Sequence, residues 1–372
     1  MRTTGERWRE PLIDDVRVSA YRIPTDRPSE SDGTLVWDAT TLVTVEVRGG
    51  GMVGLGYGYA DRATAELIHD TLIPTLKGKP ASATPQLWRA MVGEVRNLGR
   101  SGVASMAISA VDIALWDLKA KLLDVSLVTL LGAARDAIPI YGSGGFTSYS
   151  VMELCDQLAG WVGQGIPRVK MKIGRNALDD LARVRAARRA IGDDAELFVD
   201  ANGGYGRKEA IAQAERFAEW NVSWFEEPVY YRDLEGLRQV RDHAPGGMEI
   251  SVGEYAYAPD DFEAIVRAGA ADVLQADATR CEGVTGLLIA DALCEAAEMP
   301  LSTHCAASVH AHVACAAKRA RHVEYFHDHT RIEHMVFDGA LTPREGVLRP
   351  DQSRPGLGIE LKRSDLRRYA AA

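Results

Sequence analysis

The sequence is poor in cysteine and has no paired cysteine motif. No two of its five cysteines form a C-x-x-C pair, and their number is odd; they are Cys155, Cys281, Cys294, Cys305 and Cys315. A disulfide framework usually shows an even count with regular spacing. We therefore expect free, mostly buried thiols in a reducing compartment, which predicts a cytoplasmic location.

Long apolar runs and an excess of positive charge are also missing. There is no stretch of about 18 apolar residues to span a membrane, and the N-terminal segment MRTTGERWREPLIDD is unlike a signal peptide. The formal net charge is −9, whereas nonspecific nucleic acid binding usually needs a basic face. These absences argue against membrane and nucleic acid partners. They do not exclude an anionic small molecule, because a bound cation and lysines can dominate a site locally.

The hydrophobic pattern changes near residue 130. Before that point, strand-like alternation at residues 14–23 and 40–48 is followed by helical spacing, which is clearest over residues 102–123. A short sheet followed by helices predicts an α+β domain at residues 1–130. Residues 346–372 contain turns and short strands, and we expect this tail to return to the first domain.

Residues 131–345 alternate short apolar strands with amphipathic helices. This alternation predicts a parallel sheet, either doubly wound or closed, and about eight strand-like runs favour a closed barrel. Nearly every run ends in a reactive side chain: Ser143, Lys170 and Lys172, Asp200, Glu226, Glu254, Asp277, His304 and Glu324. The carboxyl ends of barrel strands face one pocket, so these side chains are predicted to share one site.

Lys170 and Lys172 are two positions apart on one strand, so both side chains should point to the same face. Two neighbouring ammonium groups repel one another, which lowers a lysine pKa and prepares one of them as a general base. The alternative for the pair alone is two exposed lysines at a strand edge.

Asp200, Glu226 and Glu254 lie 26 and 28 residues apart, one strand–helix unit each. Each alone could be a helix cap or a loop residue, but three in register would repel one another unless a cation lies among them. Oxygen ligands suit Mg²⁺, so we predict one Mg²⁺ in the site. Asn202 should face the same pocket, and Glu227 should point away from it.

Asp277 and His304 end successive strands, and a carboxylate that accepts from an imidazole nitrogen sets its tautomer and raises its basicity. The strand of His304 lies across the barrel mouth from that of the lysines. A substrate carboxylate on the cation would present its α-carbon to both groups, which predicts removal of an α-proton through an enediolate. Glu324 could donate to the substrate carboxylate if its pKa is raised.

The ordered segments VKMKIG, VDANGGY, WFEEP, VGE, DATRCEGVTG and LSTHCA, with the helix GVASMAISAVDIALWDLKAK, resemble the enolase superfamily and specifically its mandelate racemase subgroup. The resemblance implies a modified TIM barrel, (β/α)7β, with an N-terminal α+β capping domain, an essential Mg²⁺ and a homo-oligomer. It implies three metal ligands, Asp200, Glu226 and Glu254, and the catalytic residues Lys172, His304, Asp277, Lys170 and Glu324. The implied substrate is an α-hydroxy acid or acid sugar.

The segment from Pro24 to Trp37 is polar and is expected to close over the pocket, as the cap loops of this family do. Polar groups there favour a polyhydroxylated ligand over mandelate, and Arg27 could pair with a distal carboxylate. The predicted substrate-binding residues are Ser143, Asn202, Arg27, Trp37, His327 and His329. For the loop residues the alternative is a solvated loop.

The leading hypothesis is a Mg²⁺-dependent dehydratase that converts an acid sugar to a 2-keto-3-deoxy acid. The alternative is a racemase or epimerase of a 2-hydroxy acid, which would use the same residues. A cycloisomerase is less expected, because relatives of that type commonly lack the Asp/His pair. A hypothesis of a different class is a noncatalytic barrel that serves in binding.

Overall fold

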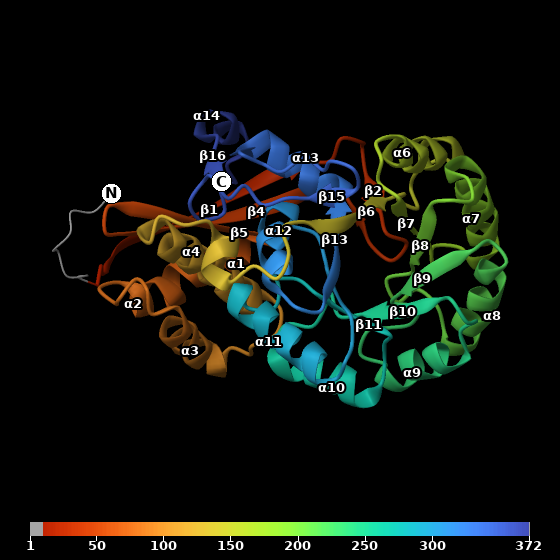
Figure 1. Ribbon diagram of the computed structural model, residues 1–372, viewed down its shortest axis with the longest axis horizontal. Helices are drawn as coiled ribbons and strands as arrows, with labels where there is room; N and C mark the ends of the chain where they lie inside the picture. Colours follow the sequence, from red (N-terminus) through yellow and green to blue (C-terminus); the bar gives the residue numbers. More distant parts are fainter. Residues whose placement is uncertain (1–9, 372) are drawn as a thin grey trace.

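The computed structural model describes residues 10–371, in which a mainly antiparallel α+β unit lies against a parallel barrel (Figure 1). The first unit, as described, has a three-stranded sheet in the order β1 (Ile13–Pro24), β4 (Ala39–Gly49) and β5 (Met52–Tyr59). Gly50 and Gly51 join β4 to β5 with φ of 58° and 78°, a conformation that glycine adopts without strain. GGGMVGLGYG therefore forms a hairpin.

Helices follow this sheet in the chain. They are α1 (Arg62–Leu67), the π-helical turn η1 (Ile68–Leu72), α2 (Ile73–Leu76), α3 (Thr84–Glu94), the short η2 (Val95–Asn97), α4 (Val103–Leu122) and α5 (Leu127–Leu131). Of these, α1 and α4 pack on the sheet. The long helix α4 lies directly on β5, because a Cβ on Gly54 would come within 2.1 Å of the Ala114 carbonyl oxygen. Val43, Val45 and Val47 of β4 are fully buried in this core.

Within residues 10–371, eight parallel strands form a closed barrel, because β13 pairs with β6. The strands are β6 (Ile138–Gly144), β7 (Arg168–Lys172), β8 (Glu196–Asp200), β9 (Val222–Glu226), β10 (Glu249–Val252), β11 (Val273–Ala276), β12 (Leu301–Thr303) and β13 (Ala320–Phe326). The prediction of a modified TIM barrel is confirmed, and the doubly wound alternative is wrong.

The helices alternate with the strands and form the outer ring of the barrel (Figure 1). They are α6 (Val151–Gly163), α7 (Ala177–Ile191), α8 (Arg207–Ala218), α9 (Leu234–His243), α10 (Pro259–Ala268), α11 (Gly283–Ala296) and α12 (Ala307–Ala316), with α13 (His327–Val336) after the last strand. Lys172 pairs in register with Asp200, and Asp200 with Glu226, so three of the predicted site residues stand at one level of the barrel.

The C-terminal segment pairs with β6 of the barrel and then runs back along the first unit. It contains β14 (Phe337–Asp338), β15 (Val347–Leu348), β16 (Glu360–Leu361), α14 (Arg363–Leu366) and η3 (Arg367–Tyr369). The Leu357 amide donates to Asp117 of α4 at 2.6 Å, and Arg363 pairs with Glu46 of β4. The tail, residues 346–372, therefore contacts the first unit. The boundary between the barrel domain, residues 131–345, and this tail stays a prediction.

The segment from Pro24 to Trp37, called the lid segment below, is a small hairpin of β2 (Glu30–Ser31) and β3 (Val36–Trp37) rather than a plain loop. It reaches over to the barrel, where the Thr147 amide donates to the Ser31 carbonyl at 2.8 Å. In the described residues, no helix is long and apolar enough to cross a bilayer.

Candidate active site

Three carboxylates meet at the carboxyl ends of β8, β9 and β10. Ligand-type atoms of Asp200, Glu226 and Glu254 all lie within 4.8 Å of one another, and the three residues are at most 2% exposed. Burial and the neighbouring carboxylates raise the pKa of Glu226 to about 8, although Lys170 acts in the opposite direction. Such a set requires compensating positive charge, and its hard oxygen atoms fit a divalent cation.

Lys170 lies beneath these carboxylates and is fully buried. Its Nζ lies 2.6 Å from Glu226 Oε1, 2.8 Å from Glu324 Oε1 and 3.6 Å from Asp200 Oδ2. Burial alone would lower the pKa of Lys170, but the attraction of Glu226 and Glu324 raises it well above the usual range. Lys170 is therefore a permanent cation that holds the carboxylates together.

Lys172 lies at the pocket side of the same strand. Its Nζ donates to Asp200 Oδ2 at 2.5 Å and to Asn202 Oδ1 at 3.0 Å. Burial lowers the pKa of Lys172, and so does Lys170, yet the attraction of Asp200, with Glu254 and Glu226, outweighs them and raises the pKa. We expected the repulsion from Lys170 to leave Lys172 with a lowered pKa. That expectation is wrong, because the carboxylates around Lys172 outnumber the lysines.

His304 and Asp277 form the predicted pair. Nδ1 of His304 donates to Asp277 Oδ2 at 2.8 Å, and Nε2 lies 3.2 Å from Glu254 Oε2. The Thr279 amide and hydroxyl both donate to the other Asp277 oxygen at 2.7 Å. Burial would raise the pKa of Asp277, but the bond and charge of His304 lower it to about 2. The imidazole ring is thereby held in one orientation, with Nε2 toward the carboxylates.

Glu324 occupies the place expected for it, but not the expected protonation state. Its Oε1 accepts from Lys170 and its Oε2 accepts from the Cys305 amide at 3.0 Å. Burial raises the pKa of Glu324, but Lys170 and His304 outweigh burial and lower it below the usual range. A raised pKa was the condition for Glu324 as a proton donor, and these side chains do not meet it.

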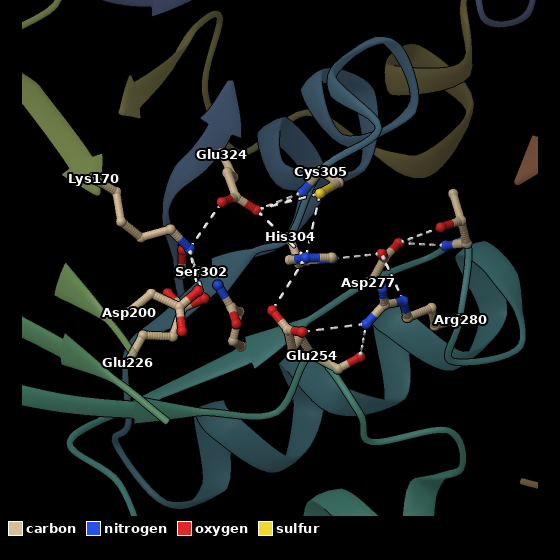
Figure 2. A network of polar contacts seen from close by, with 12 residues as sticks. Lys170, Asp200, Glu226, Glu254, Asp277, Arg280, Ser302, His304, Cys305 and Glu324 are labelled. Carbon is tan, nitrogen blue, oxygen red and sulfur yellow. Dashed lines mark hydrogen bonds and ion pairs between the residues drawn. The ribbon is translucent and has the colours of Figure 1, made fainter. Parts of the chain in front are cut away.

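Figure 2 shows a continuous polar network from Lys170 through Glu324, Cys305 and His304 to Asp277 and Arg280. Two members of it were not predicted to have a role. Arg280 Nη1 donates to the Glu254 carbonyl at 3.2 Å, and its guanidinium lies 5.0 Å from the centre of the Tyr255 ring. Cys305 Sγ lies 3.2 Å from His304 Nε2. Arg280 stands three residues after Asp277, just past a strand end, and that position was the available sequence signal.

These groups open into a cavity of about 340 Å³ between the barrel mouth and the first unit. Lys172, Asn202, Glu254 and His304 line it from the barrel, and Asp32, Leu35, Trp37, Thr40, Thr41 and Tyr59 line it from the first unit. The cavity is therefore roofed by the lid segment and the β4–β5 sheet. Most of these lining side chains carry a hydrogen-bonding group.

The predicted substrate-binding residues divide into two groups. Asn202, Trp37 and His329 line the cavity; the His329 ring stacks on Tyr59 with centroids 3.4 Å apart. Burial lowers the pKa of His329 to about 3, so its imidazole is neutral.

The other three lie outside the cavity lining. Ser143 is fully buried on β6. Arg27 turns outward and pairs with Glu153 at 3.3 Å, while His327 lies 2.9 Å from Asp26. The hairpin of the lid segment directs Arg27 toward α6, so the structure does not place it where it would meet a distal carboxylate.

The fold and the site define a barrel enzyme with a buried carboxylate triad between a lysine and a histidine. Residues 16–132 match the mandelate racemase / muconate lactonizing enzyme N-terminal domain, and residues 153–365 match the enolase C-terminal domain-like family. The chain therefore belongs to the enolase superfamily, in its mandelate racemase and muconate lactonizing enzyme family, as predicted.

Curated relatives span nearly the whole chain. It is 34% identical to the 3,6-anhydro-α-L-galactonate cycloisomerase of Streptomyces coelicolor over 96% of this chain and 99% of that protein. It is 31% identical to the L-talarate/galactarate dehydratase of Salmonella typhimurium over 96% of this chain and 90% of that protein.

Solved structures agree in fold. A mandelate racemase/muconate lactonizing enzyme-like protein from Rubrobacter xylanophilus superposes with a TM-score of 0.95 at 51% identity, covering 97% of this chain and 100% of that one. A racemase from Streptomyces coelicolor with bound magnesium superposes with a TM-score of 0.91 at 31% identity, over 97% and 100%. The expectation of a magnesium-dependent family is confirmed by such structures.

Proposed function

We propose that this protein removes the α-proton of a carboxylate substrate with the help of Mg²⁺ and dehydrates an acid sugar to a 2-keto-3-deoxy acid. One observation carries the proposal: Lys172 contacts the triad at Asp200, and the His304–Asp277 pair contacts it at Glu254. Two acid/base groups thus approach one cation site from two sides in a single cavity, an arrangement suited to proton removal and return.

Asp200, Glu226 and Glu254 would hold the cation. When bound, Mg²⁺ supplies positive charge that stabilises the additional negative charge of the enediolate. The raised pKa of Glu226 supports this assignment, because the buried carboxylate is incompletely neutralised by Lys170.

Lys172 is assigned as the base that takes the α-proton at Nζ. Its raised pKa comes mainly from Asp200, and neutralisation of Asp200 by a cation would weaken that attraction while the repulsion from Lys170 persists. The pKa of Lys172 would then fall toward the range in which a lysine accepts a proton. Lys170 orients Glu226 and Glu324 and stays protonated.

His304 is assigned as the acid. Asp277 accepts the Nδ1 proton, so Nε2 is the nitrogen that faces the cavity and can donate. In the dehydration, the α-proton moves to Lys172, the β-hydroxyl leaves with a proton from His304 as water, and the resulting enol becomes the keto acid. The polar roof of the cavity supports a polyhydroxylated substrate.

A cycloisomerase is the second candidate, because the relative that is 34% identical over nearly the whole chain carries that activity. Because of that relative, the Asp/His pair is a weaker reason to expect a dehydratase rather than a cycloisomerase. Ring opening by β-elimination would use the same base and acid, with a ring oxygen as the leaving group in place of a hydroxyl. Racemisation or epimerisation would instead return the proton to the other face of the α-carbon.

The test is incubation with Mg²⁺ in D₂O, with a panel of aldonic, aldaric, anhydro- and simple 2-hydroxy acids, followed by proton NMR and mass spectrometry. Dehydration predicts a 3-deoxy methylene and the loss of one water from the substrate mass. A methylene at unchanged mass would indicate cycloisomerisation, and α-exchange or inversion alone would indicate racemisation. No exchange with any acid would overturn the proposal and favour a binding role.

A further inference from the structure

A second group of metal-ligating side chains lies between the lid segment and α13, outside the triad. Asp26 and Glu30 of the lid segment and His327 and Asp328 of α13 each offer one ligand atom, and these atoms lie within 4.8 Å of one another. We propose that this lid cluster is a second divalent-cation site, of the Mn²⁺ or Zn²⁺ class. This inference does not depend on the reaction proposed above.

The independent observation is an unpartnered oxygen on a buried side chain. Glu30 is 0% exposed, and its Oε2 has no hydrogen-bond partner among residues 10–371. Its other oxygen has only a long contact of 3.4 Å from the Tyr149 hydroxyl. Burial of a carboxylate oxygen without a donor is unfavourable, so a proton or a cation must compensate for it.

Charge at the lid cluster is unbalanced. Three carboxylates lie beside Arg331, whose Nη2 is 3.3 Å from Asp328 Oδ1. Burial, together with Asp328 and Asp26, raises the pKa of Glu30 to about 10. A divalent ion would neutralise the excess that Arg331 leaves.

The donor set indicates which ion fits. Carboxylate oxygens suit Mg²⁺, Ca²⁺ and Mn²⁺, whereas an imidazole nitrogen suits Zn²⁺ and other transition metals. A mixed set of three carboxylates and His327 Nε2 is therefore best met by Mn²⁺ or Zn²⁺. His327 Nε2 lies 2.9 Å from Asp26 Oδ2, and an ion bound between these two atoms would replace that contact.

The exposure of the cluster is graded, which provides a route for an ion. The side chains of Asp26 and His327 are 38% and 25% exposed, whereas Glu30 and Asp328 are buried. Asp328 Oδ2 also accepts from Trp37 Nε1 at 3.2 Å, and Trp37 lines the cavity. An ion held here would fasten the lid segment to α13 and would order the roof of the cavity.

The experiment counts cations on the full chain after chelation and dialysis. The metal-free protein is titrated with Mn²⁺, with free Mn²⁺ followed by electron paramagnetic resonance, and separately with Zn²⁺ by equilibrium dialysis and elemental analysis. We expect two Mn²⁺ or two Zn²⁺ per chain in the wild type. The Glu30→Gln and Asp26→Asn variants should each bind one cation per chain. Their affinity for a cation at the lid cluster should fall at least tenfold.

Two controls separate the sites. Asp200→Asn should lose the barrel cation and keep the lid cation, and in that background Mn²⁺ should slow hydrogen exchange in residues 26–37. Asp38→Asn alters a carboxylate next to the lid segment that is paired with Arg22 on the surface, and it should still bind two. One cation per wild-type chain with both metals, or a second cation retained in both Glu30→Gln and Asp26→Asn, would overturn the inference.

If Glu30→Gln fails to fold, Asp26→Asn still tests the site, because Asp26 lies at the exposed edge. Failure of the proposed reaction would show as no α-proton exchange in D₂O with a normal cation count. Failure of the lid site would show as a count of one with exchange intact. The two outcomes are therefore distinguishable.

Discussion

Two carboxylate clusters each contribute one residue, Glu254 or Asp328, to the lining of the cavity, and they differ in how the chain holds them. The triad stands on neighbouring strands in register, and Lys170 and Lys172 contact it directly. The lid cluster joins segments about three hundred residues apart, with Arg331 as its fixed cation. Barrel strands keep the triad in place without an ion, whereas the lid cluster has to hold its own segments together. The triad is therefore a preorganised site, whereas the lid cluster is a contact that holds the lid segment to α13.

Removal of divalent cations should have the largest effect, and it should affect the two clusters differently. In excess chelator, turnover should vanish, because the triad is the proposed cation site. Mg²⁺ should restore it, while Mn²⁺ or Zn²⁺ should be needed to protect the lid segment from hydrogen exchange. Full turnover in excess chelator would refute the metal requirement.

Lys172→Met should remove the proposed base and lower kcat by about 10²–10⁴-fold, the usual contribution of a general base. Circular dichroism should show an unchanged fold. Lys208→Met, at an exposed position of α8, is the matched control and should keep full kcat. If Lys172→Met turned over acid sugars at the wild-type rate, the assignment of the base would have to be abandoned.

Replacement of the cation within each cluster should sharpen the contrast. Lys170→Met would leave Glu226 and Glu324 buried without their partner, and we expect a loss of about 3–5 kcal/mol in the free energy of unfolding. Arg331→Met removes a partly exposed guanidinium, so the loss should be about 1 kcal/mol. Urea unfolding with chelator present measures both. Equal losses would show that the two clusters are held alike.

The pH dependence of the Asp277–His304 pair is a smaller effect than the loss expected for Lys170→Met. Because the folded pKa of Asp277 is lowered to about 2 from 3.8, ionised Asp277 stabilises the fold above about pH 4. This contribution, about 2 kcal/mol, is lost as the pH falls through about 2. The difference in unfolding free energy between wild type and Asp277→Asn should therefore shrink on acidification; a constant difference would contradict the lowered pKa.

Strand spacing predicted most of the barrel and its site. Asp200, Glu226 and Glu254 recur after one strand–helix unit each, and closure of the barrel then brings them together. Period-two alternation likewise placed Lys170 and Lys172 on one face. Spacing and alternation could be used for prediction because the geometry of strands and of the barrel fixes where each side chain lies.

Other features depended on contacts between distant segments. Arg27 was expected in the cavity and instead pairs with Glu153, because the lid segment folds as a hairpin. The raised pKa of Lys172 and the lowered pKa of Glu324 follow from buried neighbours on other strands. The contacts of Arg280 with Glu254 and Tyr255 depend on the turns after β11 and β10, which only the fold brings together.

The repeat of strands and helices, the order of the reactive residues and the family could thus be read from the amino acid sequence, because they follow from short-range periodicity and spacing. The charge state of each group, the hairpin of the lid segment and the contact of Arg331 with Asp328 came only with the folded chain. Electrostatic energy and burial depend on distances through space, and the strands and lid that set those distances are far apart along the chain.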